Sequence, residues 1–224
     1  MNRCSKPVGG FTLVELLVSM ALGFTILLTT TQLFIDHRLA SQTQQQWLTL
    51  HEQGRHALQF LTTELRKAGY PAESFVGSAL TAENSSGELN SDSITLSYQN
   101  GLDCAGSSAT SIRYYLQENT LRCDGNGSAY PSPQTLTSPI DGLQFRFGID
   151  QDGDHSVDQY LNADQIADWE SVRTVEVAIL LRSESVARQQ PDDTLYSLLD
   201  VDHGPYQDYY LRKIYQMTVQ LRNR

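Results

Sequence analysis

The feature that most constrains this chain is an apolar run near the N-terminus with a charged residue inside it. Residues 11–35 read FTLVELLVSMALGFTILLTTTQLFI, which is about the length that a helix needs to cross a bilayer. Glu15 is the fifth residue of that run. A charged side chain inside a membrane helix costs about 3 kcal/mol on insertion scales and generally has a function and a partner. The run therefore predicts a membrane helix, and Glu15 predicts an interaction made within it.

The residues before the run predict its orientation and its processing. Arg3 and Lys6 lie in the N-terminal stub, so we expect the stub in the cytoplasm and the remainder of the chain exported. An ordinary secretory signal has a shorter apolar core with small residues after it, whereas Gly9 and Gly10 come before this run. Cleavage there would remove the stub and leave the apolar helix on the protein.

Cleavage after Gly10 would also supply a partner for Glu15. It frees an α-amino group on Phe11, a cation one helical turn from the carboxylate, and the pair could form within one chain or between neighbouring chains. The alternative is a helix that begins after Glu15 and leaves the charge among the lipid headgroups. The apolar side chains of Leu13 and Val14 argue against that alternative.

The stretch GGFTLVE at residues 9–15 resembles the prepilin signature of type IV pilins and type II secretion pseudopilins. In that family a membrane prepilin peptidase cuts after the glycine and methylates the new N-terminal amine. The resemblance implies a leader of residues 1–10, a cut between Gly10 and Phe11, N-methylation of Phe11, and subunit docking through Glu15. Loss of the leader would leave 14 basic side chains against 26 acidic ones, a net charge of −12.

After the membrane or filament-core segment, 11–35, the pattern becomes amphipathic. Apolar or small residues recur at spacings of three and four, and Gly69-Tyr70-Pro71 then supplies a stop: Trp47, Leu50, Gly54, Leu58, Leu61, Leu65 and Ala68. We expect one helix of about 55–60 residues, whose second half, 36–70, lays this stripe on a globular head.

The remaining sequence, 71–224, predicts a periplasmic, β-rich head in which an antiparallel sheet packs on the helix, an α+β architecture. Strands are predicted at 94–98, 111–117, 121–123, 143–149, 174–181 and within 209–221, with a hairpin turn at 118–120. Residues 73–93 and 183–191 are predicted as loops, and the DHGP at 202–205 as a turn.

Two of the three cysteines, Cys104 and Cys123, remain if the stub with Cys4 is removed. An exported chain meets an oxidising compartment, where disulfides persist. Both residues lie in polar, Gly/Ser-rich contexts beside predicted strands, so we expect a Cys104–Cys123 disulfide. The alternative is two unrelated buried thiols.

Three further stretches are similar to the minor pilin PilW group: RHALQFLTTELRKAGY at 55–70, GIDQDGDHSVDQYL at 148–161 and YYLRKIYQMTVQLRN at 209–223. The last is also similar to the J-type minor pseudopilins. The resemblance implies a single-pass inner-membrane protein with a periplasmic head that later enters the pilus. It implies a part in priming assembly, a place near the tip, and support of motility, adhesion or DNA uptake.

The implied partners are the prepilin peptidase, other minor pilins and the major pilin, the inner-membrane assembly platform, and a PilY-type tip adhesin. The alternative is a J-type minor pseudopilin of a type II secretion system. A membrane-anchored binding module is a third class, but the acidity of the chain disfavours direct binding of nucleic acid.

The sequence DQDGDHSVD resembles calcium loops, with carboxylates at loop positions one, three, five and nine: Asp150, Asp152, Asp154 and Asp158. Two departures matter. His155 stands where such loops carry glycine in a turn that often needs positive φ, and Leu161 replaces the bidentate carboxylate. Asp164 could substitute only if the chain bends back. Calcium is the one cofactor predicted, and an acidic solvated turn is the alternative.

No pattern of an enzyme is present in the sequence. It contains no HExxH, nucleophile elbow, P-loop or CxxC, and His51 and His56 are five apart, so they do not share a helix face as a metal pair would. We therefore expect no catalytic residues and a structural rather than an enzymatic role.

The predicted cut after Gly10 is tested by Gly10→Ser. We expect this substitution to block processing, because the peptidase signature requires the glycine, and the chain should then keep its leader on an immunoblot. A band that runs at the mature size would show that no cleavage depends on Gly10.

Overall fold

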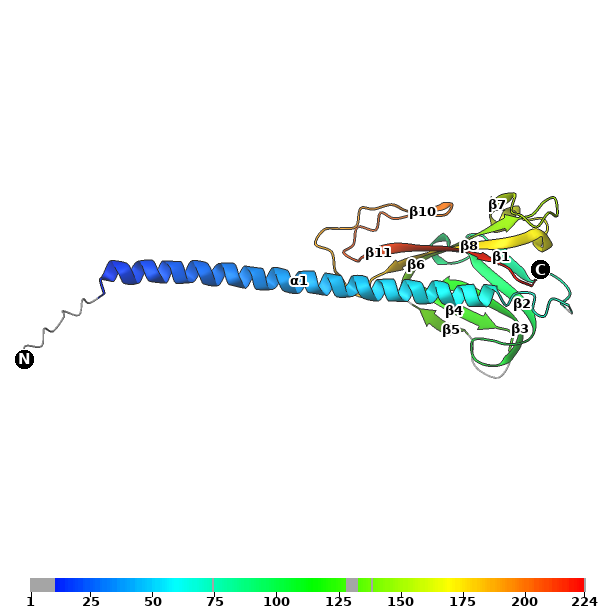
Figure 1. Ribbon diagram of the computed structural model, residues 1–224, viewed down its shortest axis with the longest axis horizontal. Coiled ribbons are helices and arrows are strands. Elements are labelled where there is room, and N and C mark those ends of the chain that lie inside the picture. The colour runs from blue at the N-terminus through cyan, green and yellow to red at the C-terminus, as the bar shows by residue number, and fades with distance from the viewer. Residues whose placement is uncertain (1–10, 74, 128–132, 138, 224) are drawn as a thin grey trace, which may run out of the picture. The chain divides into compact units, whose positions relative to one another are not determined.

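The computed structural model describes residues 11–73, 75–127, 133–137 and 139–223 (Figure 1). The chain forms two compact units, residues 1–44 and residues 45–224. Helix α1, Leu13–Leu65, contributes to both units, and every strand lies in the second unit, for which we use the term head.

Helix α1 is continuous over 53 residues, and no proline interrupts it. Beyond Arg66 the backbone hydrogen bonds of the last turn join residues three apart instead of four, and the Lys67 N–H donates to the Glu64 carbonyl at 2.9 Å. Gly69 then adopts φ +74°, where a Cβ atom would lie 2.7 Å from the Asn223 carbonyl oxygen. The predicted helix is confirmed, but it ends at Leu65 rather than Tyr70 because its last turn has shorter hydrogen-bonded rings.

The strands form two antiparallel sheets and one small hairpin (Figure 1). The five-stranded sheet has the order β1-β2-β3-β4-β5, with bounds Leu80–Glu83, Ser93–Leu102, Ser108–Gln117, Thr120–Gly125 and Gln134–Thr137. The four-stranded sheet has the order β11-β8-β6-β7, with bounds Arg212–Gln220, Val172–Arg182, Ile140–Ile149 and Gln159–Leu161. The hairpin pairs β9, Tyr196–Leu198, with β10, Val201–His203.

The α+β fold is confirmed, with corrections. The head has two main sheets where one was predicted, and the predicted loop at 73–93 contains β1 and the 3₁₀ turn Glu88–Asn90. The six predicted strands coincide with β2, β3, β4, β6, β8 and β11, while five short strands were missed: β1, β5, β7, β9 and β10. Of the turn predicted at 202–205, Asp202 and His203 belong to β10 instead, and Gly204, whose φ is +97°, follows the strand.

The hydrophobic core of the head lies between α1 and both sheets, which Figure 1 shows alongside one another. The predicted stripe is confirmed, with Trp47 half-buried and the others buried: Leu50, Gly54, Leu58, Leu61, Leu65 and Ala68. Gly54 lets the Tyr215 ring of β11 approach the helix, since a Cβ atom there would lie 2.5 Å from that ring. The helix therefore supplies the core surface that both sheets share.

One buried charge on the helix was not anticipated. Glu64 is 8% exposed, accepts a hydrogen bond from the Tyr114 hydroxyl at 3.1 Å and pairs with Lys67 at 2.6 Å. Burial and the adjacent Glu64 carboxylate raise the pKa of Tyr114. This contact fixes the helix against β3 by a directional bond, in addition to apolar packing.

Asp92, just before β2, links the two sheets. Its N–H donates to the Leu143 carbonyl of β6, and its carboxylate accepts from the N–H groups of Phe145 and Ser85, each at 2.8 Å. Burial, opposed by these two hydrogen bonds, raises the pKa of Asp92 to about 6. The link therefore holds a carboxylate that titrates in the weakly acidic range.

The predicted disulfide is present between Cys104, in the loop after β2, and Cys123, in β4, with Cα atoms 6.3 Å apart. The hairpin between β3 and β4 turns at Glu118 and Asn119, whose φ angles are +52° and +54°. This is the type I′ geometry that suits two-residue hairpins. The Cys104 loop is thus tied to the strand beyond the hairpin.

A buried guanidinium anchors the long excursion between β8 and β11, residues 183–211. Arg212, whose side chain is 1% exposed, contacts Asp141 of β6 at 2.6 Å, Asp192 at 3.3 Å and Asp208 at 2.6 Å. The Tyr206 ring centroid lies 3.6 Å from its guanidinium carbon. These four charged residues form a clamp, because Asp192 and Asp208 belong to the excursion and Asp141 to the sheet.

The clamp predicts the effect of Arg212→Met. Arg212 is the side chain that contacts all three carboxylates, and its loss leaves Asp141 and Asp192 only their second pairs with Arg182 and Arg188. We therefore expect the free energy of unfolding to fall by about 3 kcal/mol, the lower end for a broken buried pair. Urea unfolding of the full chain in non-ionic detergent measures this, with Arg146→Met as the matched control on a partly exposed strand position. Equal stability of the two variants would contradict the role assigned to the clamp.

The clamp also predicts a pH dependence. Against the effect of burial, hydrogen bonds from Tyr196 and Thr194 lower the pKa of Asp192, and the hydrogen bonds from Arg212 lower the pKa of Asp208. This stabilisation is present above the unfolded aspartate pKa of about 4 and is lost as the pH falls through the lower folded values. Since Arg212 acts on the pKa of Asp208, Arg212→Met should weaken the acid sensitivity of unfolding, which urea titrations of both proteins over a series of pH values measure.

Candidate functional site: the helix start and the acidic loop

The start of α1 is capped by a side chain. The Glu15 N–H donates to Thr12 Oγ1 at 3.3 Å, and the Leu16 N–H donates to the Thr12 carbonyl at 3.2 Å. Thr12 is therefore the N-cap, and Glu15 stands at the third helical position, as in the capping-box pattern T-x-x-E. The sequence carries this signal in TLVE, in which Glu15 follows Thr12 by three residues. The cap places the Glu15 carboxylate in the first turn, beside the positive end of the helix dipole.

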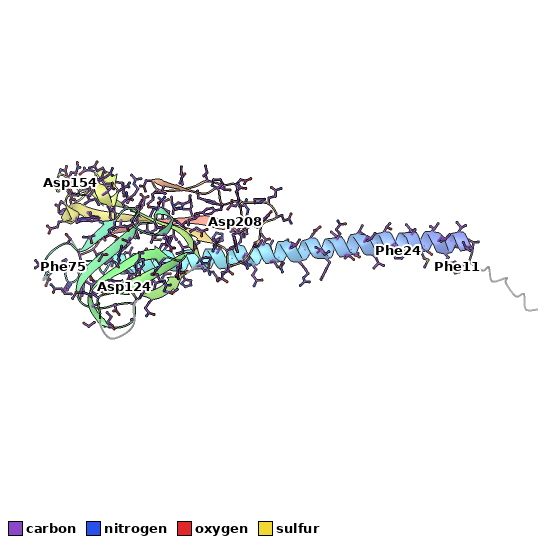
Figure 2. All side chains as sticks on the ribbon, turned by 180° about the vertical axis from the view of Figure 1, so that it is seen from behind. Phe11, Phe24, Phe75, Asp124, Asp154 and Asp208 are labelled. Atoms are coloured by element: carbon purple, nitrogen blue, oxygen red, sulfur yellow. A yellow bond between two sulfur atoms is a disulfide. The ribbon has the colours of Figure 1, made fainter. Side chains whose placement is uncertain are left out.

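The surface of α1 in the first unit is apolar and uncovered. Every side chain from 11 to 42 is exposed, with Phe11 at 86% and Phe24 at 64%, and both project from the helix in Figure 2. An 18-residue window of this helix has a mean hydropathy of 2.0, and none of it is buried. So much apolar surface requires a lipid or protein environment, which matches the predicted membrane helix.

The hydroxyl groups within this segment are already bonded to the helix itself. Side chains donate to backbone carbonyls three or four residues earlier at 2.8–3.0 Å, namely those of Ser19, Thr25, Thr29, Thr30 and Thr31. Polar groups satisfied in this way can lie in hydrocarbon without an external partner.

The predicted site residues at this end are placed only in part. Gly10 lies outside the described residues, whereas Phe11 and Glu15 flank the cap. The cut after Gly10, the methylation of Phe11 and the pairing of Glu15 with an amine remain predictions of the sequence.

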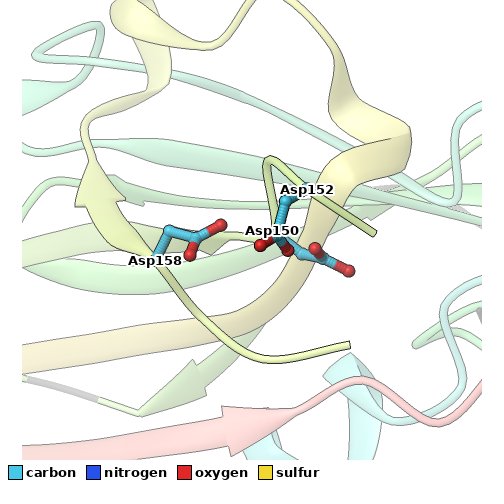
Figure 3. A group of neighbouring side chains, drawn as sticks. All are labelled: Asp150, Asp152 and Asp158. Atoms are coloured by element: carbon cyan, nitrogen blue, oxygen red, sulfur yellow. The ribbon is translucent and has the colours of Figure 1, made fainter. Parts of the chain in front are cut away.

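The acidic loop between β6 and β7 brings together three of its four predicted carboxylates (Figure 3). Ligand oxygens of Asp150, Asp152 and Asp158 all lie within 4.8 Å of one another. Asp154 is not in this group, and its carboxylate accepts from the Ser156 N–H and hydroxyl. Asp164 bonds to Asn84 instead, at 3.1 Å. The predicted set of four is thus reduced to three in this structure.

Asp150 is the organising residue of the loop. It is buried and pairs with Arg173 at 2.9 Å, and it accepts from the N–H groups of Gly153 and His155. Against the effect of burial, the hydrogen bonds from Arg173 and from these two N–H groups lower the pKa of Asp150. His155, the first departure from the calcium-loop pattern, nevertheless has φ +69°, the left-handed conformation for which such loops usually carry glycine.

The carboxylates of the loop can attract a cation, but one oxygen of Asp150 already forms an ion pair with Arg173. Asp152 and Asp158 are exposed, while the Asp150 carboxylate neutralises Arg173. Among the described residues, this is the one place where three potential His, Cys, Asp or Glu ligands come together. Calcium binding therefore stays a prediction of the sequence.

Comparisons with known proteins agree with this architecture. A family model described as type IV pilus-assembly protein W matches residues 105–223, more than half of the chain, and a prokaryotic N-terminal methylation motif matches residues 5–31. A type IV-like pilin from Thermus thermophilus has a similar structure, with a TM-score of 0.51 and 18% identity. That match covers 78% of this chain and 97% of the other. A search of curated proteins found no match.

The calcium prediction is tested by titration of the full chain in non-ionic detergent. If the loop binds calcium, isothermal titration should show heat at millimolar calcium, and Asp152→Ala should abolish it. Asp154→Ala is the matched control, because this neighbouring carboxylate lies outside the group, and it should keep the heat. No heat, or the same loss in both variants, would contradict binding by these three residues.

Proposed function

Because the chain belongs to the type IV pilus-assembly protein W family, we propose that it is a minor pilin that helps to start pilus assembly and is then incorporated in the pilus. Residues 1–10 would be the leader, 11–35 the membrane and filament-core segment, 36–70 the amphipathic half of the helix, and 71–224 the periplasmic head. The protein would act by assembly and not by catalysis.

The observation that carries this proposal is the contrast between the two halves of α1. The half before residue 45 exposes all its apolar side chains up to residue 42, whereas the half within the head buries one stripe in a complete core. A helix of this kind can leave the bilayer only for another apolar environment. A bundle of like helices in a filament provides one.

Processing and docking are chemically linked in this proposal. The prepilin peptidase would cut after Gly10 and methylate the new amine of Phe11. That cation would meet the Glu15 carboxylate, which the Thr12 cap holds in the first turn of the helix. Pairing between neighbouring subunits would set their axial register in the filament. A carboxylate in an apolar bundle needs such a partner.

The other partners follow from the family. They would be the remaining minor pilins, the major pilin, the inner-membrane assembly platform and a PilY-type tip adhesin, in support of motility, adhesion or DNA uptake. The alternative, a J-type pseudopilin of a type II secretion system, receives less support because the family model matched over 105–223 is that of pilus assembly. A deletion strain scored for both surface pili and protein secretion separates the two: loss of secretion with normal pili would contradict the pilus role.

The docking role is tested by Glu15→Val and Glu15→Gln. Glutamine can still form the capping box but has no charge, so the pair of variants separates helix capping from ion pairing. We expect both proteins to insert in the membrane, and both to be reduced at least about tenfold in sheared pili, since breaking a buried pair costs about 3–5 kcal/mol. Normal incorporation of Glu15→Gln would show that the charge is not needed.

A further inference from the structure

The edge of the four-stranded sheet at β11 is open along nine residues, Arg212–Gln220. The strand pairs with β8 in unbroken register, and within the described part of the chain no backbone hydrogen bond joins residues 212–220 to any other segment. Alternate peptide groups of β11 therefore point away from the sheet without a main-chain partner.

This edge differs from the other edges of the head. The outer strands β1 and β5 have 4 residues each, β7 has 3, and the β4–β5 pair contains a register shift. Short strands and bulges are the usual devices by which proteins avoid pairing with other chains. β11 has neither a bulge nor a proline, and its one charged residue beyond the buried Arg212 is Lys213.

Solvent reaches this strand from both faces of the sheet at its middle. Gln216, Met217 and Thr218 are all exposed although successive side chains point to opposite faces. On the helix side, Thr62 bonds to Met217 and His51 to the Tyr215 hydroxyl, at 2.9 Å and 3.1 Å. These contacts show which flank of α1 runs beside the edge, and Figure 1 shows the two elements alongside.

The same flank carries unpaired positive charge on an acidic protein. Arg55 follows His51 by one turn, Arg66 follows Thr62 by one turn, Lys213 lies on the strand, and Arg222 follows it. Within the described residues none of these four forms an ion pair. Seven other basic residues do: Lys67, Arg113, Arg122, Arg173, Arg182, Arg188 and Arg212.

We propose that the β11 edge, flanked by Arg55, Arg66, Lys213 and Arg222, accepts an extended acidic segment of a different protein chain as an added strand. Open peptide groups are matched by the peptide groups of a polypeptide, and the four cations favour carboxylate side chains along it. Taking that chain to be another pilus subunit rests on the proposed function, whereas the binding surface does not.

A second copy of this chain is a poorer occupant. Pairing of two β11 edges would bring the Lys213 and Arg222 side chains of one copy to the same edge as the Lys213 and Arg222 side chains of the other. Like charges facing each other are unfavourable. The charges at the β11 edge therefore disfavour a second copy of this chain and favour an acidic partner.

The experiment uses the purified full chain in non-ionic detergent and three labelled peptides of about nine residues that alternate valine with a charged residue, the usual length of a strand being similar. One peptide carries glutamate, the second is the same with alternate backbone nitrogens methylated, and the third carries lysine. Fluorescence anisotropy should show binding of the glutamate peptide, and at least about tenfold weaker binding of the other two.

Variants place the binding on this surface. The double variant Arg55→Glu, Lys213→Glu should bind the glutamate peptide about tenfold more weakly and the lysine peptide more tightly. Arg146→Glu, on another strand, should change the affinity for neither peptide. Unchanged circular dichroism would show that each variant is folded, and Lys213→Gln alone serves if the double variant is not.

Several outcomes would overturn the proposal. The first two are no binding of the glutamate peptide and equal binding of the N-methylated peptide. The others are tighter binding of a DNA oligonucleotide of the same charge, and concentration-dependent dimers that the glutamate peptide does not dissociate. None of these results depends on pilus assembly. A failure here would therefore leave the proposed function to be judged by the Glu15 variants alone.

Discussion

One helix has to be compatible with two different environments, and the other features of the structure follow from this constraint. Up to residue 42, α1 exposes its whole circumference, which suits lipid or a bundle of similar helices. Within the head the same helix buries a single stripe and leaves its other faces to water. The helix runs through the transition, and no proline lies in it. The change is made only by the choice of side chains.

The head is organised by what the buried stripe of α1 can hold. Leu50 to Leu65 contact both sheets, so the helix is the shared wall of one core. Polar contacts then fix the orientation of each part: Glu64 with Tyr114 for the helix, Asp92 for the junction of the sheets, and Arg212 for the excursion at 183–211. Such contacts are costly to leave unsatisfied, and they therefore make the arrangement specific.

The parts of this protein that could be predicted from sequence are those that repeat or have strong composition. Hydrophobic periodicity or a high content of branched side chains identifies three such parts: the apolar run, the helical stripe from Leu50 to Ala68, and the long strands β6 and β8. The short strands β1, β5 and β7 could not be found, because three or four residues do not establish a period. The division into two sheets depends on long-range contacts such as Asp92 with Phe145, which no local pattern encodes.

The sites divide in the same way. The loop spacing suggested that Asp150, Asp152 and Asp158 would lie close together, as they do, but only the fold shows that Asp150 forms an ion pair with Arg173 of β8. The capping box at Thr12 was not predicted, although it is local and the sequence TLVE contains it: a threonine stands three residues before Glu15. The β11 edge was not foreseeable, since being an edge is a property of topology.

The threonines of the first unit have a consequence for the passage from membrane to filament. Thr29, Thr30 and Thr31 direct their hydroxyls to carbonyls of their own helix, so the segment presents methyl groups outward. The hydrogen bonds of these hydroxyls lie within the helix itself. No water therefore has to be removed from them when the lipid around the helix is replaced by protein. For this segment, the free energies in lipid and in a bundle of helices then differ little, because both surroundings are apolar. The charged residue in the first turn of the helix is left to decide which of the two is preferred.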